Sequence, residues 1–383
     1  MARIEADWLT SDATQAVFAM LVDGGHQVFA VGGCVRNSLL QQPVKDIDLA
    51  TDAVPDRVIG LAKSAGLDAV PTGISHGTVT VLSDNVSFEI TTFRRDIATD
   101  GRRAVVAFSD RIEDDARRRD FTMNALYADP EGNVRDPLNG LPDLRARRVR
   151  FIEDAAARIR EDYLRSLRYF RFHAWYGNAA EGFDPDALDA IARNLEGLAQ
   201  LSKERIGSEF KRLLEAPDPT IAVAGMRSTG ALPAILPGAT DAALGPLIHL
   251  ENQAEVPPES IRRLASLGGE DVSAALRLSK KEARQLADTR NAAGLSAAEA
   301  GYRFGADIGR DGQLIRMASM SAPFESRVFT QVLDASKQVF PVKAGDLMPK
   351  VDGKALGDAL DQLERAWIAS GFKLGKAELI SKL

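Results

Sequence analysis

Two glycines that follow a short apolar run constrain this chain more than any other feature. Val28 to Val31 has the apolar character of a strand, Gly32 and Gly33 follow at once, and Cys34 to Leu40 has a helical pattern. A strand, a Gly-Gly turn and a helix N-terminus present free backbone N–H groups and a positive dipole end to an anion. The sequence therefore predicts a phosphate-binding turn at Gly32 and Gly33.

Asp46 and Asp48 alternate along a second predicted strand, Val44 to Thr51. The period of two in a strand puts both carboxylates on one face, where they repel each other unless a cation lies between them. The alternative is that both simply lie on the exposed face of an edge strand. Because the predicted phosphate turn is just upstream, the pair indicates Mg²⁺-dependent nucleotide chemistry.

Length and composition favour a multidomain cytoplasmic protein. A chain of 383 residues is too long for one compact core, so we expect roughly two to four domains. The single cysteine, Cys34, excludes an internal disulfide and a cysteine-built zinc site. The first twenty residues lack a basic start with an apolar core, and no apolar run is long enough to span a bilayer, so we expect no membrane partner.

For judging whether nucleic acid is a partner, the distribution of charge along the chain matters more than the net charge of −6. Between Arg94 and Arg171 there are 18 arginines and no lysine, against 15 acidic residues. Arginine suits bidentate recognition of phosphates and base edges, although salt bridging at the surface is the alternative. The cluster lies beside the carboxylate strand in the sequence, which favours phosphate contacts.

A third carboxylate lies in a predicted hairpin. Val79–Leu82 and Val86–Phe93 flank Ser83-Asp84-Asn85, which we interpret as a three-residue turn. The second arm contains Glu89, the only carboxylate of the two strands. Three carboxylates on neighbouring strands are what a two-metal phosphoryl-transfer site requires, whereas the alternative for Glu89 is a solvated strand residue. Helices between the early strands, with a helix from Pro55 to about Ser64, predict a mixed α/β sheet.

Beyond the hairpin the chain changes character. Arg94 to Ala104 is polar and contains Gly101, which predicts a mobile loop. Asp136-Pro137-Leu138-Asn139-Gly140 has turn chemistry and is a candidate hinge. From about Ile152 strand signals almost vanish and helical patterns follow, the first over roughly 154–177, so a domain boundary is expected at 140–152.

Asp162, Arg165 and Arg168 lie three residues apart within that first helical pattern. At 100° per residue the three share one side of a helix. One interpretation is an ion pair between helix neighbours. The other is an acceptor beside a donor fork, which could pair with the edge of a nucleobase.

Five segments, in their order, resemble the motif series of the class II tRNA nucleotidyltransferases, the CCA-adding enzymes, and of the closely similar bacterial poly(A) polymerases. The resemblance spans roughly residues 25–215. The segments are Gly32-Gly33-x-Val35-Arg36, Asp46-x-Asp48, Arg118-Arg119-Asp120-Phe121-Thr122-Met123-Asn124-Ala125, Asp136-Pro137-Leu138-Asn139-Gly140 and Glu161-Asp162-x-x-Arg165-x-x-Arg168.

The resemblance implies an α/β head with the nucleotidyltransferase fold, followed by an elongated all-α region of neck, body and tail. We place the catalytic head at 1–145, the neck with its nucleotide-selecting helix at 146–220, and the body and tail at 221–383. The helical part would bind the 3′ end and the acceptor and elbow region of tRNA.

The resemblance also implies a role for each matching residue. Asp46 and Asp48 match the ligands of two Mg²⁺ ions, and Glu89 matches the third catalytic carboxylate. The nucleotide-binding residues fall into four groups: triphosphate contacts at Gly32, Gly33 and Arg36, ribose selection at Arg119, Asp120 and Asn124, the amino-acid template for C and A at Asp162 and Arg165, and a phosphate contact at Arg168. Two positions depart from the family pattern: Asn37 replaces an aspartate, and Leu138-Asn139 replaces the commoner Gly-Gly.

Within the family, the segment Pro71 to Val79 decides the choice. It has no basic residue, unlike the basic, aromatic segment of the poly(A) polymerases, and so resembles the CCA-adding group. The Arg94–Arg103 segment has full length, unlike in enzymes that add only CC, so we expect addition of both C and A. The hypothesis is template-independent, stepwise transfer of CMP, CMP and AMP from CTP and ATP to the tRNA 3′ end. A poly(A) polymerase and a non-catalytic RNA- or nucleotide-binding relative remain the alternatives.

Overall fold

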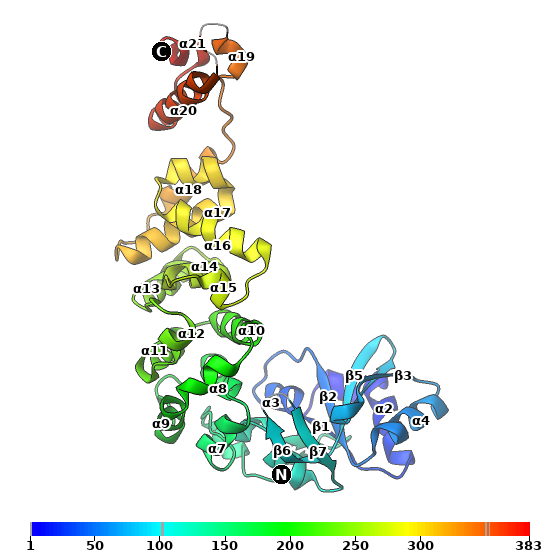
Figure 1. Cartoon of the computed structure of the whole chain (residues 1–383). Helices are drawn as coiled ribbons and strands as arrows, with labels where there is room; N and C mark the ends of the chain where they lie inside the picture. Colours follow the sequence, from blue (N-terminus) through cyan, green and yellow to red (C-terminus); the bar gives the residue numbers. More distant parts are fainter. Residues whose placement is uncertain (1, 101–102, 349–350, 352) are drawn as a thin grey trace. The chain divides into compact units, whose positions relative to one another are not determined.

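The computed structural model describes residues 2–100, 103–348, 351 and 353–383. The chain divides into two compact units. Unit 1 comprises Met1–Ser202 and Ser228–Ala234, and unit 2 comprises Lys203–Arg227 and Ile235–Leu383. Strands occur only in the blue-to-teal part of the chain, and the described residues after β9 form helices and connections (Figure 1). The expected α/β region followed by a helical region is confirmed, whereas the three-part division into head, neck, and body with tail stays a prediction.

A seven-stranded mixed sheet forms the centre of unit 1, in the order β3-β4-β5-β2-β1-β8-β9. Its strands are β1 Val28–Val31, β2 Ile47–Thr51, β3 Asp68–Gly73, β4 Thr78–Ser83, β5 Val86–Thr92, β8 Tyr127–Ala128 and β9 Val134–Arg135. The β2–β5 pair is parallel, and β1 is antiparallel to both β2 and β8. The parallel pair matters for the site because it brings β2 and β5, which are far apart in the sequence, into direct register.

Helices of unit 1 pack on this sheet and continue beyond it. They are α1 Asp7–Thr10, α2 Asp12–Asp23, α3 Gly33–Leu39, α4 Pro55–Ser64, α5 Ile112–Arg117, α6 Leu141–Arg145, α7 Ala155–Glu161, α8 Leu164–Tyr176 and α9 Pro185–Arg193, with 3₁₀ turns at Ile74–His76, Thr122–Asn124 and Leu195–Gln200. A buried apolar cluster joins the sheet to the later segments: Val31, Ala50, Phe93, Ala116, Ala125, Tyr127 and Ile152. The sheet is therefore packed against helix α5, through Ala116, and against the later segment that contains Ile152.

Two local predictions in the sheet were wrong in detail. Strand β2 begins at Ile47 rather than Val44, so Asp46 lies immediately before the strand. Pro43, which has no backbone N–H, precedes this irregular stretch, and its carbonyl accepts a hydrogen bond from the Asn37 amide at 2.8 Å. The β4–β5 turn has two central residues, not three, because Ser83 pairs with Val86. Asp84 and Asn85 both have positive φ, 48° and 64°, which these residue types tolerate.

The segment predicted as a mobile loop is a β-ribbon. Strands β6 Arg94–Asp100 and β7 Arg103–Phe108 pair antiparallel as a separate two-stranded sheet, and Gly101 lies outside the described residues. Ribbon formation here was missed because a polar, arginine-rich composition hides the alternation that marks a half-buried strand. The base of the ribbon is fixed: the Ser109 N–H donates to the Phe93 carbonyl at 2.8 Å.

The single helix predicted over 154–177 is two helices with a break at Asp162. Helix α7 ends at Glu161, and Asp162 has extended backbone angles (φ −154°, ψ 104°). Its side chain accepts a hydrogen bond from the Leu164 N–H at 3.1 Å, at the start of α8. Asp162 therefore lies in the break between the helices, one residue before the N-cap Tyr163 of α8, and does not share a helical face with Arg165 and Arg168.

The regular elements among the described residues of unit 2 are all helices, apart from one isolated β-bridge between Ala239 and Gly268. Its helices are α10 Lys203–Leu214, most of α11 Thr220–Thr229, the end of α12 Ala231–Ile235, α13 Leu244–Gln253, α14 Ser260–Leu267, α15 Val272–Ala275, α16 Lys280–Ala293, α17 Ala297–Ser319, α18 Ser326–Ala335, α19 Ala344–Leu347, α20 Gly353–Ala369 and α21 Lys376–Ile380. The last three surround an apolar cluster centred on Trp367. No described helix combines the length and the apolar character needed to cross a membrane.

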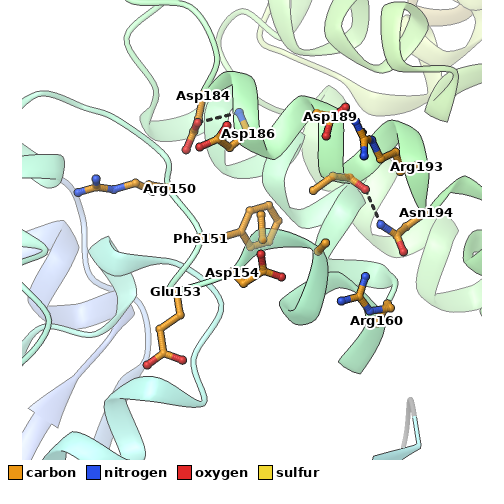
Figure 2. Close-up of a pocket in the computed structure, with 13 residues that line it drawn as sticks. Arg150, Phe151, Glu153, Asp154, Arg160, Asp184, Asp186, Asp189, Arg193 and Asn194 are labelled. Carbon is orange, nitrogen blue, oxygen red and sulfur yellow. Dashed lines mark hydrogen bonds and ion pairs between the residues drawn. The ribbon is translucent and has the colours of Figure 1, made fainter.

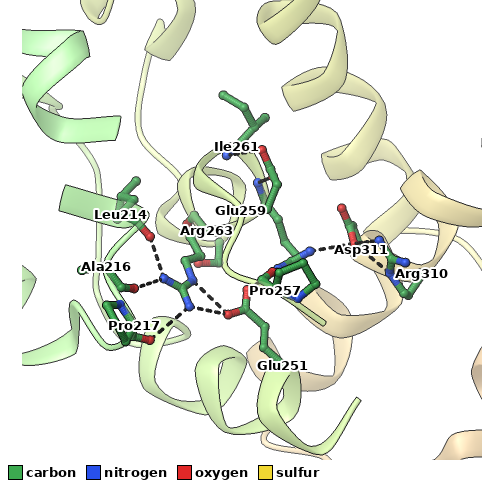
Figure 3. A network of polar contacts seen from close by, with 12 residues as sticks. Leu214, Ala216, Pro217, Glu251, Pro257, Glu259, Ile261, Arg263, Arg310 and Asp311 are labelled. Carbon is green, nitrogen blue, oxygen red and sulfur yellow. Dashed lines mark hydrogen bonds and ion pairs between the residues drawn. The ribbon is translucent and has the colours of Figure 1, made fainter. Parts of the chain in front are cut away.

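Two neighbouring arginines of α14, Arg262 and Arg263, are buried in unit 2, and Figure 3 shows the contacts of Arg263. Arg263, 1% exposed, donates to the Glu251 carboxylate at 2.7 Å and to the backbone carbonyls of Leu214 and Ala216 at 2.6 and 2.5 Å. Arg262, 2% exposed, donates to the other oxygen of Glu251 at 2.7 Å and to Asp311 at 3.1 Å. The pair thus joins the end of α10 to α13, α14 and α17.

Candidate active site

The predicted order of strand, glycine turn and helix is present, but the N–H of Gly32 is engaged rather than free. Gly32 lies between β1 and α3 with φ 71° and ψ −116°, a conformation that L side chains rarely adopt. Its N–H donates to the Leu126 carbonyl, and its carbonyl accepts from the Arg36 N–H at 2.9 Å. A Cβ atom at position 32 would lie 3.4 Å from Nη1 of Arg119. The structure thereby brings Gly32 and Arg119, two predicted nucleotide contacts, together.

The two strand carboxylates are direct neighbours, since Asp48 on β2 pairs with Glu89 on the parallel strand β5. Asp48 is partly buried, whereas Asp46 and Glu89 are exposed. Burial raises the pKa of Asp48, repulsion from Glu89 and Asp46 raises it further, and Arg119 opposes both effects. Such a shift is expected where a partly buried carboxylate lies close to other carboxylates.

The donor set suits a cation that completes its coordination with substrate oxygens. Among the described residues no three acidic, histidine or cysteine side chains converge on one point as a ready-made metal site. Mg²⁺, however, is commonly held by one or two carboxylates, with substrate phosphates and water as the other ligands. Asp46 and Asp48, next to the Gly32 turn, fit that requirement.

Asp120 to Asn124 are buried, Arg119 is partly buried, and acidic residues pair with the arginines of this region. Arg119 donates to Asp115 at 2.9 Å and to the Tyr127 hydroxyl at 3.2 Å. Asp120 accepts from the Asn124 amide at 2.8 Å and from Nε of Arg168 at 2.8 Å. Although burial raises the pKa of Asp120, Arg168 and the Asn124 hydrogen bond outweigh it and lower the pKa to about 2. The Asp120 carboxylate is therefore charged and already paired with Arg168.

Arg36 extends this network to the phosphate turn. Its Nη1 donates to the Asn124 side-chain oxygen at 2.5 Å, and its Nε donates to Asn37 at 3.1 Å. The amide of Asn37 both accepts from Arg36 and donates to the Pro43 carbonyl, which an aspartate could not do. The departure from the family pattern at position 37 thus has a defined structural role.

Arg165 is held by Glu161, a residue of the same motif to which the resemblance assigned no role. Its Nη1 donates to Glu161 at 2.6 Å and to the Arg158 carbonyl at 3.0 Å, while its Nη2 donates to the Arg118 carbonyl at 3.2 Å. Asp162 lies at the α7–α8 break, next to Glu161 in the chain. Asp162 and Arg165 therefore both lie near the α7–α8 junction, but Asp162 has extended backbone whereas Arg165 lies within helix α8.

The turn at Asp136 to Gly140 forms as predicted. The two carboxylate oxygens of Asp136 accept from the N–H groups of Gly140 at 2.7 Å and Leu141 at 2.9 Å. Asn139 has a positive φ of 56°, and a Cβ atom on Gly140 would lie 2.3 Å from the Thr122 carbonyl oxygen. The turn is in contact with the 119–124 segment, while its action as a hinge stays a prediction.

A pocket of about 520 Å³ between α7 and α9 contains none of the predicted site residues (Figure 2). Several of its charged groups already have local partners. Asp154 caps α7, Asp184 caps α9, and Asp189 pairs with Arg193 at 2.9 Å. These carboxylates stabilise helices, so the pocket does not compete with the Gly32–Asp48 region as the candidate active site.

Two site residues were missed by sequence reasoning. Asp115 is fully buried between Arg118, Arg119 and the Tyr127 hydroxyl, which donates to it at 2.7 Å. Its spacing of three and four residues from the two arginines was a usable signal. Tyr176, whose hydroxyl accepts from Arg36 at 2.9 Å, lies 140 residues along the chain from Arg36, so no local pattern marked it.

Known proteins resemble this chain along most of its length. Residues 28–150 match the family model of the poly A polymerase head domain, and residues 182–243 match the probable RNA and SrmB- binding site of polymerase A. Mitochondrial CCA tRNA nucleotidyltransferase 1 of Mus musculus is 32% identical over 97% of this chain and 90% of its own length. The Homo sapiens protein of that name is 41% identical over 54% of this chain, a match that spans about half of the human protein (48%).

Among solved structures, the CCA-adding enzyme of Bacillus stearothermophilus in complex with CTP is 27% identical, with a TM-score of 0.73 over 94% of each chain. The names of the two mammalian relatives place them in mitochondria, so the cytoplasmic location stays a prediction. Sequence identity and fold agree over almost the whole chain. This protein therefore belongs to the family of class II CCA-adding tRNA nucleotidyltransferases.

Proposed function

We propose that the protein adds CMP, CMP and AMP stepwise to the 3′ end of tRNA, taking them from CTP and ATP. The observation that carries the proposal is the direct register of Asp48 with Glu89, beside Asp46 and the Gly32 turn. This arrangement supplies acidic groups next to a backbone turn suited to a triphosphate. Family membership and the relative solved with CTP support the choice of substrate.

In the proposed reaction the 3′ hydroxyl oxygen of tRNA bonds to the α-phosphorus, and the bond from that phosphorus to the β-phosphate oxygen breaks. Pyrophosphate leaves, and the hydroxyl proton passes to a carboxylate, for which we propose Glu89, whose side chain is exposed. Asp46 and Asp48 would hold two Mg²⁺ ions, which when bound neutralise charge on the triphosphate and activate the hydroxyl. Gly32, Gly33 and Arg36 orient the triphosphate, and Arg119, Asp120 and Asn124 contact the ribose.

Selection between C and A is proposed to rest on Asp162 and Arg165. Because Arg165 is fixed by Glu161 whereas Asp162 lies at a helix break, a change in backbone at Asp162 would alter their spacing. The β6–β7 ribbon is the proposed lever for that change. Arg168 is already paired with Asp120. It would therefore contact a phosphate either while keeping its hydrogen bond to Asp120 or after giving that bond up.

Replacing Arg165 by Ala is expected to raise the incorporation of GMP and UMP by about tenfold or more, since one bidentate base contact is worth ~1–3 kcal/mol of discrimination. The KM for CTP should change less than this error rate. Sequencing of tRNA 3′ ends after incubation with all four nucleotides measures both. Arg160→Ala, an exposed arginine on α7, is the matched control. Error rates equal to those of the unmodified protein would remove Arg165 from base selection.

The function itself is tested by incubating the purified protein with tRNA that lacks its 3′ CCA, together with CTP, ATP and Mg²⁺. We expect sequenced ends that terminate in CCA. A parallel incubation of generic RNA with ATP alone tests the poly(A) polymerase alternative. This test is needed because residues 28–150 match a family model described as the poly A polymerase head domain. Long A tails there, without C addition to tRNA, would reverse the proposal, and no addition in either reaction would favour a binding protein.

A further inference from the structure

The guanidinium of Arg36 has few hydrogen-bond donors left for a ligand. Arg36 is 6% exposed, and its Nε and Nη2 both donate to the side-chain oxygen of Asn37, at 3.1 and 2.9 Å. Nη1 donates to Asn124 at 2.5 Å, and Nη2 also donates to the hydroxyl of Tyr176 at 2.9 Å. An arginine has five N–H groups, so four are engaged and one on Nη1 is left. A triphosphate oxygen would therefore meet a guanidinium that other side chains have already oriented.

Tyr176 holds this guanidinium by its ring as well as by its hydroxyl. Cζ of Arg36 lies 4.0 Å from the centroid of the Tyr176 ring and 5.2 Å from that of Phe172, one turn earlier on α8. An arginine over an aromatic face is attracted by the ring quadrupole, and the attraction grows when the pair is removed from water. The C-terminal half of α8 thus contacts Arg36 of α3 through two aromatic rings and one hydroxyl.

The same helix closes a ring of polar contacts. Arg36 binds Asn124, Asn124 binds Asp120, and Asp120 binds Arg168 at 2.8 Å. Arg168 and Tyr176 both lie on α8, two turns apart. Two separate hydrogen-bonded routes therefore connect α8 to the phosphate turn in the described part of the chain: one runs from Arg168 through Asp120 and Asn124, and the other is the direct bond between Tyr176 and Arg36.

We propose that Tyr176 is a positioning residue that fixes Arg36, and through it the triphosphate, in register with the base-selecting helix α8. This inference rests on the proposed function, because it assumes that Arg36 orients the triphosphate. Since CTP and ATP share the triphosphate, Tyr176 serves both nucleotides equally. Arg165, in contrast, acts on the base.

The experiment compares Tyr176→Phe, which keeps the ring, with Tyr176→Leu, which removes both contacts. We expect the KM for CTP and the KM for ATP to rise by the same factor in each variant. The factor should be about tenfold for Tyr176→Phe, the effect of one hydrogen bond to a charged group, and larger for Tyr176→Leu. Tyr169→Phe is the matched control, because it removes from the same helix a hydroxyl that accepts a hydrogen bond from the Asp184 N–H at 2.9 Å. Its KM values should stay unchanged.

A double-mutant cycle with Arg36→Lys separates positioning from general loss of structure. If Tyr176 acts through Arg36, the KM effects of Tyr176→Phe and Arg36→Lys do not add, whereas those of Tyr169→Phe and Arg36→Lys do. Additive effects of Tyr176→Phe and Arg36→Lys, or a rise in KM for one nucleotide alone, would overturn the inference. Thermal unfolding of each variant shows whether it is folded, and the conservative Phe variant decides the matter if Tyr176→Leu is not.

Failure of the proposed function is distinguishable from failure of this inference. If the unmodified protein adds no nucleotide to tRNA, the proposed function fails. The same cycle, measured as equilibrium affinity for CTP, then decides whether Tyr176 acts through Arg36. Equal CTP affinities for the unmodified protein and Tyr176→Phe would refute the inference in that case.

Discussion

Replacing Asp48 by Asn is expected to lower the rate of nucleotide addition by about a thousandfold or more. The reason is that a metal-holding carboxylate contributes several kcal/mol to stabilising charge in phosphoryl transfer, and ~4 kcal/mol corresponds to roughly a thousandfold in rate. The substitution keeps the shape of the side chain, and Asp48 pairs through backbone atoms with Glu89 in the sheet. Single-turnover addition of CMP to tRNA measures the effect.

Stability should change in the opposite direction from activity. The pKa of Asp48 is raised by burial and by Glu89 and Asp46, so the charged carboxylate destabilises the metal-free fold at neutral pH. A raised acid pKa means that this penalty is absent at low pH and appears as pH rises past the unfolded value. Asn at position 48 removes the penalty, so the metal-free variant should unfold at the same or a higher temperature.

The control for Asp48 is Asp84→Asn in the β4–β5 turn. Asp84 is exposed and has positive φ, which asparagine also tolerates, so both activity and unfolding should match the unmodified protein. An Asp48→Asn variant that retains full activity would contradict the assignment of this carboxylate. Loss of activity together with loss of folding would contradict the electrostatic account of Asp48.

Replacing Arg263 by Met should lower the free energy of unfolding of unit 2 by about 3–5 kcal/mol, the usual effect of removing one partner from a buried ion pair. Arg263 is enclosed, and its removal leaves the carbonyls of Leu214 and Ala216 without this donor. It also leaves Glu251 with Arg262 as its ion-pair partner among the described residues. Methionine fills a similar volume, so the loss reports polar contacts more than a cavity.

Urea unfolding followed by circular dichroism measures this loss, with Arg284→Met as the control. Arg284 has a side chain that is 85% exposed and an ion pair of 3.5 Å with Asp288, so its replacement should change the unfolding free energy by less than about 0.5 kcal/mol. Equal effects of the two substitutions would show that the buried network does not hold unit 2 together.

The spacing of apolar residues and the positions of glycines and prolines were enough to predict several turns, helices and strands of the fold. The Gly32 turn, helix α4 and the placement of Asp48 and Glu89 on strands all follow from periodicity and glycine chemistry. The break at Asp162 could not be read this way, because no glycine or proline interrupts the helical pattern there. The contact between Arg36 and Tyr176 could not be predicted either, since it depends on how α3 and α8 pack. The site was thus predictable as a set of residue types, but the partners that hold each residue were not.

The turn before α6 has a consequence for how its sequence can vary. Of its last three positions, only 140 is closed to a side chain, because a Cβ atom there would collide with the backbone of Thr122. Position 139 needs only a residue that tolerates a left-handed backbone, which asparagine satisfies. A search pattern for relatives of this protein should therefore demand glycine at 140 and allow substitution at 138 and 139, where a strict triple-glycine pattern would overlook functional sequences.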